Sequence, residues 1–187
     1  DITITPPPEC AEASAPPLQP GETVQAFVTR LAHAKAEAVS KQLPPSEARA
    51  ILACDTVGEI GGVIFGKPTD THDARRMIEA LSGKKHQVLT GVSIWFPEPT
   101  ERIKANTSPR QYHVKEGCAI SEVFMELLPK KEIDDYLATN DWHGKAGACG
   151  FQDGRLPLRL ITGSIDAVVG LPVKFIEQLV VEHLGSR

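Results

Sequence analysis

Apolar residues recur at helical spacing in four segments, which we predict to be helices: residues 22–43, 71–83, 129–139 and 171–185. In the second segment Thr71 is placed to cap the helix and Gly83 to end it, and Pro129 opens the third. The second helix is expected to bury one stripe of side chains: Ala74, Met77, Ile78 and Leu81.

Apolar runs without helical spacing predict strands. They are "AILAC" (50–54), "HQVLTGVSIWF" (86–96), "VKEGCAISEVFMEL" (114–127), "DITIT" (1–5) and one or two strands within residues 156–170. The continuous run 50–54 indicates a buried strand. Because strands and helices alternate along the chain, we predict an α/β fold with a mixed sheet flanked by helices.

The first predicted helix carries a lysine on its apolar face. Lys35 lies seven residues after Val28 and four after Leu31, so it falls on the same stripe. A lysine in this position either extends its ammonium group to solvent or serves a cleft beneath the helix that needs a cation. The sequence leaves both interpretations open.

An acid and a lysine lie on either side of a predicted hairpin. Asp55 ends the run "AILAC", and in α/β sheets the carboxyl ends of strands are where ligands bind. Gly61 and Gly62 predict a two-residue turn, since both can adopt a positive φ. Pairing about that turn would place Lys67 opposite Thr56 and one step from Asp55. The two charges are either a surface ion pair or part of a phosphate-processing site.

A glycine-rich segment, "GKAGACGFQDG", occupies residues 144–154. Backbone N–H groups of its glycines, beside Lys145, would form an anion-binding nest, and the amide of Gln152 could read the edge of a base. The alternative is a glycine-rich turn with a glutamine that faces solvent. The G-x-x-x-x-G-K-[ST] spacing of a phosphate-binding P-loop does not occur in the sequence.

Composition narrows the class of protein. The chain has 187 residues, 41% of them hydrophobic, and a formal net charge of −4. We predict a single domain over residues 1–187, and the mild acidity gives no reason to expect nucleic acid or a membrane as a partner. No apolar run reaches the roughly 18 residues of a membrane span. The four cysteines are far apart, which favours free thiols and a cytoplasmic location.

Five stretches follow one another in the order seen in the Maf family, the septum-formation-inhibitor-like nucleoside triphosphate pyrophosphatases. They are "RLAHAKA" (30–36), "ACDTVGEIGGVIFGKP" (53–68), "ARRMIEALSGKKHQVLTGV" (74–92), "YLATNDWHGKAGACGFQD" (136–153) and "AVVGLP" (167–172). The chain resembles this family over about residues 24–180, and several motifs in order are more specific than any one of them.

The resemblance implies a Maf/Ham1-type, ITPase-like fold, with an elongated mixed sheet around a central cleft, usually in a homodimer. It also implies cleavage between the α and β phosphates of a nucleoside triphosphate with the help of Mg²⁺ or Mn²⁺. The family's proton-accepting aspartate falls on Asp55, and its cleft lysines fall on Lys35 and Lys67. The residues linked to dTTP/UTP preference fall on Thr56 and Gln152.

The sequence departs from the family pattern at three places. Family members open with an S-x-S-P-R-R motif, which we expect to belong to a part of the native chain that precedes Asp1. The family's early acidic residue corresponds to Glu9 or Glu12; we assign it to Glu9, which would hold the metal together with Asp55. "GFQD" replaces the commoner "GIQG", so Asp153 would add a charge near the base pocket.

We therefore expect a nucleoside triphosphate pyrophosphatase that acts on dTTP, UTP or related modified nucleotides, with Lys145 as a further phosphate contact. One alternative is a pyrophosphatase for methylated or purine nucleotides such as 7-methyl-GTP, which a substrate panel separates. Another is a non-catalytic nucleotide-binding regulator of cell division, which would bind nucleotide without releasing pyrophosphate.

Overall fold

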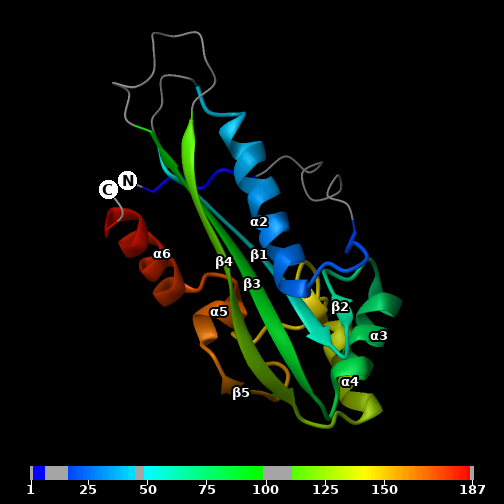
Figure 1. Ribbon diagram of the computed structural model, residues 1–187. Coiled ribbons are helices and arrows are strands. Elements are labelled where there is room, and N and C mark those ends of the chain that lie inside the picture. Colours follow the sequence, from blue (N-terminus) through cyan, green and yellow to red (C-terminus); the bar gives the residue numbers. More distant parts are fainter. Residues whose placement is uncertain (1, 7–16, 45–48, 99–110, 186–187) are drawn as a thin grey trace. The chain divides into compact units, whose positions relative to one another are not determined.

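The computed structural model describes residues 2–6, 17–44, 49–98 and 111–185 of the chain. Its helices and strands follow in this order (Figure 1): α2 (Val24–Ser40), β1 (Ile51–Ile60), β2 (Val63–Phe65), α3 (Thr71–Leu81), β3 (Lys85–Pro97), β4 (Tyr112–Met125), α4 (Lys130–Ala138), the short 3₁₀ helix η2 (Ala146–Ala148), β5 (Leu158–Thr162), α5 (Ile165–Val169) and α6 (Val173–Gly185). The four helices predicted from apolar spacing are α2, α3, α4 and α6, and all four are confirmed.

The five strands form one sheet in the order β2-β1-β3-β4-β5. Strand β1 pairs antiparallel with β2, and β4 pairs antiparallel with β5. The predicted α/β fold, a sheet flanked by helices, is confirmed. Among the helices that the structure describes, none is both long enough and apolar enough to cross a membrane.

The chain divides into two compact units. The first comprises Asp1–Asp55, Gly91–Cys118 and Lys174–Arg187, and the second comprises Thr56–Thr90 and Ala119–Val173. Strands β1, β3 and β4 each contribute residues to both units. That residues 1–187 form a single domain stays a prediction.

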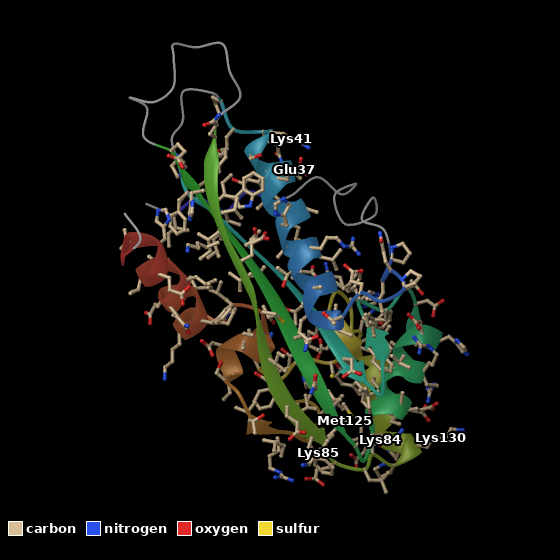
Figure 2. All side chains as sticks on the ribbon, viewed as in Figure 1. Glu37, Lys41, Lys84, Lys85, Met125 and Lys130 are labelled. Atoms are coloured by element: carbon tan, nitrogen blue, oxygen red, sulfur yellow. The ribbon has the colours of Figure 1, made fainter. Side chains whose placement is uncertain are left out.

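In the first unit, α2 lies very close to β3. The helix buries three side chains: Val28, Ala32 and Ala36. A Cβ atom added to Gly91 of β3 would lie 2.3 Å from the carbonyl oxygen of Val28, so only glycine allows this approach. Near the end of the helix, Glu37 and Lys41 form an exposed ion pair of 2.8 Å (Figure 2).

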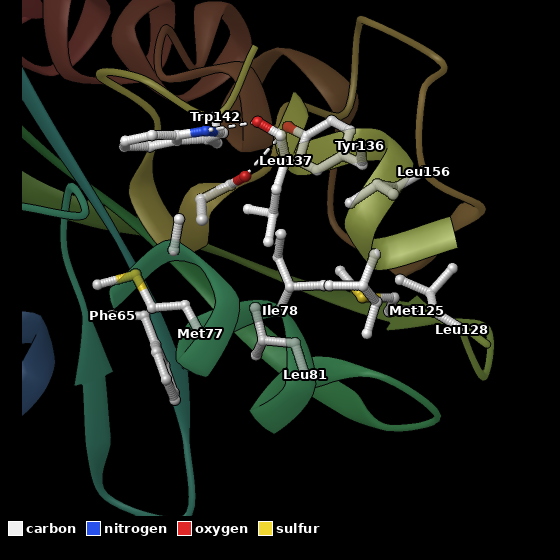
Figure 3. Close-up of a cluster of buried hydrophobic side chains, with 13 residues drawn as sticks. Phe65, Met77, Ile78, Leu81, Met125, Leu128, Tyr136, Leu137, Trp142 and Leu156 are labelled. Carbon is white, nitrogen blue, oxygen red and sulfur yellow. Dashed lines mark hydrogen bonds between the residues drawn. The ribbon is translucent and has the colours of Figure 1, made fainter. Parts of the chain in front are cut away.

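The second unit has its own hydrophobic core, drawn from β2, α3, β4, α4 and the segments that follow α4 (Figure 3). Two polar groups within it are paired, which removes most of the cost of burying them. The hydroxyl of Tyr136 donates to the carbonyl of Ala148 at 3.0 Å, and the indole N–H of Trp142 donates to the carbonyl of Leu137 at 3.2 Å. Helix α4 is thereby fixed to η2, just before the segment that carries Gln152.

Helix α3 shows both a confirmed prediction and a correction. The predicted stripe is buried as expected: Ala74, Met77, Ile78 and Leu81. The cap, however, is Asp70 and not Thr71, because the carboxylate of Asp70 accepts the N–H of Asp73 at 2.7 Å. Thr71 is instead the first residue of the helix.

Two predicted strands differ from the structure, and a third segment agrees with one of the two alternatives predicted for it. Described residues 2–5 belong to no strand, and their apolar side chains Ile2 and Ile4 are almost fully exposed. The run 50–54 is not buried throughout, since Leu52 is 46% exposed. Residues 156–170 contain one strand, β5, followed by helix α5, which the side chain of Ser164 caps by accepting the N–H of Ala167.

Candidate active site

Asp55 of β1 pairs with Lys35 of α2. The ammonium nitrogen of Lys35 donates to Oδ1 of Asp55 at 2.5 Å, and the two side chains are only 15% and 13% exposed. The lysine on the apolar stripe therefore points inward to a carboxylate. Burying two charges has a desolvation cost that their attraction does not always repay, so stability alone does not explain the pair.

Cys54, the residue before Asp55, lies in a poorly solvated part of the first unit. Burial raises the pKa of the Cys54 thiol to about 11, because the thiolate is poorly solvated there. The charge of Lys35 lowers this pKa, but by less than burial raises it. Cys54 is therefore a neutral thiol at pH 7, and the charges at this position are those of Lys35 and Asp55.

The hairpin after Asp55 has the predicted register close to its turn. Ile60 pairs with Val63 across Gly61 and Gly62, and both glycines have positive φ. The paired residues continue to Gly58 and Phe65, where β2 ends. Lys67 therefore follows the last paired residue by two positions, and its side chain is exposed.

Thr56, the residue after Asp55, takes part in a chain of hydrogen bonds in the second unit. Its hydroxyl oxygen lies 2.8 Å from that of Thr90 on β3, and Thr90 donates to the carbonyl of Ala167 in α5 at 2.7 Å. Thr90 is fully buried. Gly170 lies beside Thr56, since a Cβ atom added there would be 3.1 Å from its hydroxyl oxygen.

The glycine-rich segment is folded around a second ion pair. Lys145 donates to the carboxylate of Asp153, and both side chains are about one quarter exposed. A Cβ atom at Gly150 would collide with Asp153 and crowd Lys145, so the pair passes over a glycine. The charge that Asp153 brings to this segment is thus balanced by a lysine.

At least one N–H group of the predicted anion-binding nest, that of Gly147, is already bonded within the protein. The N–H of Gly147 donates to the carbonyl of Gly66, and the N–H of Ala148 donates to the carbonyl of Lys145. These two groups are committed to the backbone, so they do not point toward a ligand. Gln152 is exposed and lies on a turn, which fits both interpretations of this segment, so its role stays a prediction.

Comparison with known proteins identifies the family. The family model described as Maf-like protein matches residues 2–183. This chain belongs to the Maf-like family.

Curated relatives of this Maf-like chain share one name. A dTTP/UTP pyrophosphatase of Yersinia pestis bv. Antiqua is 35% identical over 169 residues, which cover 90% of this chain and 78% of the relative. Proteins with the same name from Anaeromyxobacter dehalogenans (strain 2CP-C) and Aliivibrio fischeri are 39% and 37% identical. They cover 82% and 89% of this chain, and 71% and 81% of their own lengths.

The site residues assigned from the sequence fall in both units of this Maf-like chain. Lys35 and Asp55 belong to the first unit and contact each other directly. The other four belong to the second unit: Thr56, Lys67, Lys145 and Gln152. Glu9 lies outside the described residues. Their roles stay predictions.

Sequence reasoning missed Thr90 as a partner of Thr56. The available signal was a hydroxyl residue inside the apolar run "VLTGV", where a buried polar group needs a hydrogen-bond partner. The sequence does not identify the carbonyl of Ala167 as the group that accepts from Thr90, because Ala167 lies 77 residues further along the chain.

The donor set of this Maf-like chain can be compared with what a divalent metal needs. Within the described part of the chain, no three His, Cys, Asp or Glu side chains come together as a ligand group. Asp55 fits as one ligand, because Mg²⁺ is usually held by one or two carboxylates together with substrate phosphates and water.

Proposed function

We propose that the protein is a nucleoside triphosphate pyrophosphatase that hydrolyses dTTP, UTP or related modified pyrimidine nucleotides to the monophosphate and pyrophosphate. The observation that carries the proposal is the mostly buried Lys35–Asp55 pair, whose aspartate the resemblance to the family assigns as the proton acceptor. The curated relatives, which are named dTTP/UTP pyrophosphatase, support the same reaction.

In this proposal Asp55 is the base. Its carboxylate already accepts a hydrogen bond from Lys35, and it can accept another from a water molecule. As the water oxygen bonds to the α phosphorus, the bond from that phosphorus to the oxygen shared with the β phosphate breaks. Pyrophosphate leaves with the electron pair, and one proton of the water passes to Asp55.

Cations are needed because the triphosphate is strongly negative. Lys35 would move part of its interaction from Asp55 to a phosphate oxygen, which requires only a change of rotamer in a flexible side chain. Lys67 would be the second cation, since it is exposed at the end of the hairpin. Lys145 is the weakest candidate, because a phosphate would have to compete with Asp153 for it.

A divalent metal, Mg²⁺ or Mn²⁺, is part of the proposal. Asp55 would be one ligand and Glu9 the other, with phosphate oxygens and water completing the set. When bound, the metal would neutralise charge on the phosphates.

Base selection is assigned to Thr56 and Gln152, which carry groups that can bond to a base edge. We further propose that the protein is a cytoplasmic homodimer. Sedimentation equilibrium tests the oligomeric state.

The proposal is tested by pyrophosphate release from dTTP, UTP, CTP, ATP, GTP and 7-methyl-GTP, each with Mg²⁺ and with Mn²⁺. The assay compares this chain with a version that carries an S-x-S-P-R-R segment ahead of Asp1. We expect release from dTTP and UTP in at least one version. Release from purine nucleotides alone would replace the proposed substrates, and nucleotide binding without release would favour a non-catalytic regulator.

A further inference from the structure

The hydrogen-bond chain from Thr56 to Ala167 has a direction that elementary chemistry determines. The two oxygen–oxygen distances are 2.8 Å and 2.7 Å, so each contact needs a proton between its oxygens. A carbonyl oxygen has no proton, so Thr90 must donate its only one to Ala167. The proton between the two threonines therefore comes from Thr56.

This direction leaves Thr56 as a hydrogen-bond acceptor toward any other group. Its one proton points to Thr90, which is fully buried, so bulk water does not compete for that bond. The neighbouring residue Gly170 has a φ of 103°, and a Cβ atom there would come within 3.1 Å of the Thr56 oxygen. The hydroxyl of Thr56 is thus not covered by a side chain at position 170.

We propose that Thr90 is a positioning residue that sets the base preference of the protein, by holding Thr56 as an acceptor. This inference rests on the proposed function, in which Thr56 contacts the base. Uracil and thymine carry an N–H donor at ring position 3, whereas cytosine has a lone pair there. The acceptor oxygen of Thr56 can accept the N–H of uracil or thymine. With cytosine it would face a ring nitrogen that carries a lone pair, and no hydrogen bond would form.

The test compares Thr90→Val with Thr90→Ser. Valine keeps the shape of threonine but removes the hydroxyl, so Thr56 is free to turn its proton toward the base. We expect the ratio of kcat/KM for UTP to that for CTP to fall about tenfold in Thr90→Val, the size of one lost hydrogen bond. Thr90→Ser keeps the hydroxyl and should keep the ratio.

Ser121→Ala is the matched control, because it loosens the same helix without touching Thr56. Ser121 is fully buried, and its hydroxyl both donates to the carbonyl of Ser164 at 3.3 Å and accepts the N–H of Ser164 at 3.2 Å. Ser164 caps α5. If Ser121→Ala lowers the UTP/CTP ratio as much as Thr90→Val does, the effect is one of α5 anchoring and the inference is wrong.

A binding measurement separates this inference from the proposed reaction. Titration calorimetry with UMP and CMP gives the same discrimination ratio without turnover. The parent chain could release no pyrophosphate and still bind UMP more tightly than CMP, with this preference lost in Thr90→Val. That result would overturn the proposed hydrolysis and support the role of Thr90. An unchanged ratio in Thr90→Val overturns that role. Should this variant not fold, Thr56→Val removes the acceptor itself, and an unchanged ratio in that variant overturns the inference equally.

Discussion

At the scale of single residues, Lys35 and Asp55 combine two roles that experiments can separate. The pair is mostly buried, and each charge stabilises the other. The proposed chemistry depends on the carboxylate in particular, because it receives the proton. Substitutions that change one charge at a time therefore have distinct expected results.

Replacing Asp55 with Asn keeps the shape of the side chain and removes the base. Turnover on the best nucleotide is expected to fall by ~10²–10⁴-fold, the usual contribution of a positioned general base. Steady-state pyrophosphate release measures it. Asp135→Asn is the control, because Asp135 also pairs with a lysine, Lys131, but on the exposed face of α4. Near-normal turnover in Asp55→Asn would remove Asp55 from its proposed role.

Replacing Lys35 with Met tests the pair as a structural element. The carboxylate of Asp55 would stay mostly buried without its cation, so the free energy of unfolding should fall by about 1–3 kcal/mol. Adding Asp55→Asn removes the carboxylate charge that Lys35 no longer balances and should restore part of the loss, which urea denaturation of the single and double variants will show. Lys131→Met breaks a pair that is fully exposed to solvent and should lower the free energy of unfolding far less than Lys35→Met does. Equal losses in the two lysine variants would contradict this account.

At the scale of elements, periodicity located the long helices because each buries one continuous stripe. It did not predict α5 within residues 156–170, which were expected to hold one or two strands, although Ser164 caps this helix and Gly170 ends it in a left-handed conformation. It also failed for residues 2–5, because alternation alone does not provide a neighbouring strand.

The same limit applies to the candidate site. The sequence placed Lys35 on an inward face and Asp55 at the end of an apolar run. Helical periodicity indicates which face of a helix is buried, but it does not indicate which residue that face contacts. The hairpin suggested Lys67 as the cation closest to Asp55. One contact of Asp55 comes from Lys35, which lies 20 residues before Asp55 on another element.

The approach of α2 to β3 predicts a severe effect from one methyl group. In Gly91→Ala the new Cβ atom would overlap the backbone of Val28, so the helix must move. The free energy of unfolding should fall by about 3 kcal/mol or more, as for other overpacked core positions. Gly66→Ala is the control, since no atom lies within 4 Å of a Cβ atom there. Denaturant unfolding in which both variants match the parent would show that α2 is not so closely packed.

At the scale of the whole molecule, stability should depend on pH through a buried histidine. Burial lowers the pKa of His86 below its ordinary value of 6.5, because the charged ring is poorly solvated in the folded state. Between the folded pKa and 6.5 the unfolded chain binds more protons than the folded one. The contribution of His86 to stability is therefore complete above pH 6.5 and is lost as the pH falls.

This dependence can be measured as the free energy of unfolding between pH 5 and pH 8. The parent chain should lose stability on the acid side, and His86→Leu should lose less, because it has no proton to take up on unfolding. Parallel pH profiles for the two proteins would show that His86 does not contribute.

The glycine at position 91 also limits how the gene for this protein can vary. Every amino acid that a missense change can introduce there carries a Cβ atom, and that atom meets the Val28 carbonyl whatever its side chain contains beyond it. Position 91 therefore has no conservative substitute in the genetic code. In a library of all single substitutions selected for folded protein, this codon should be depleted of every alternative, whereas codon 66 should accept small residues.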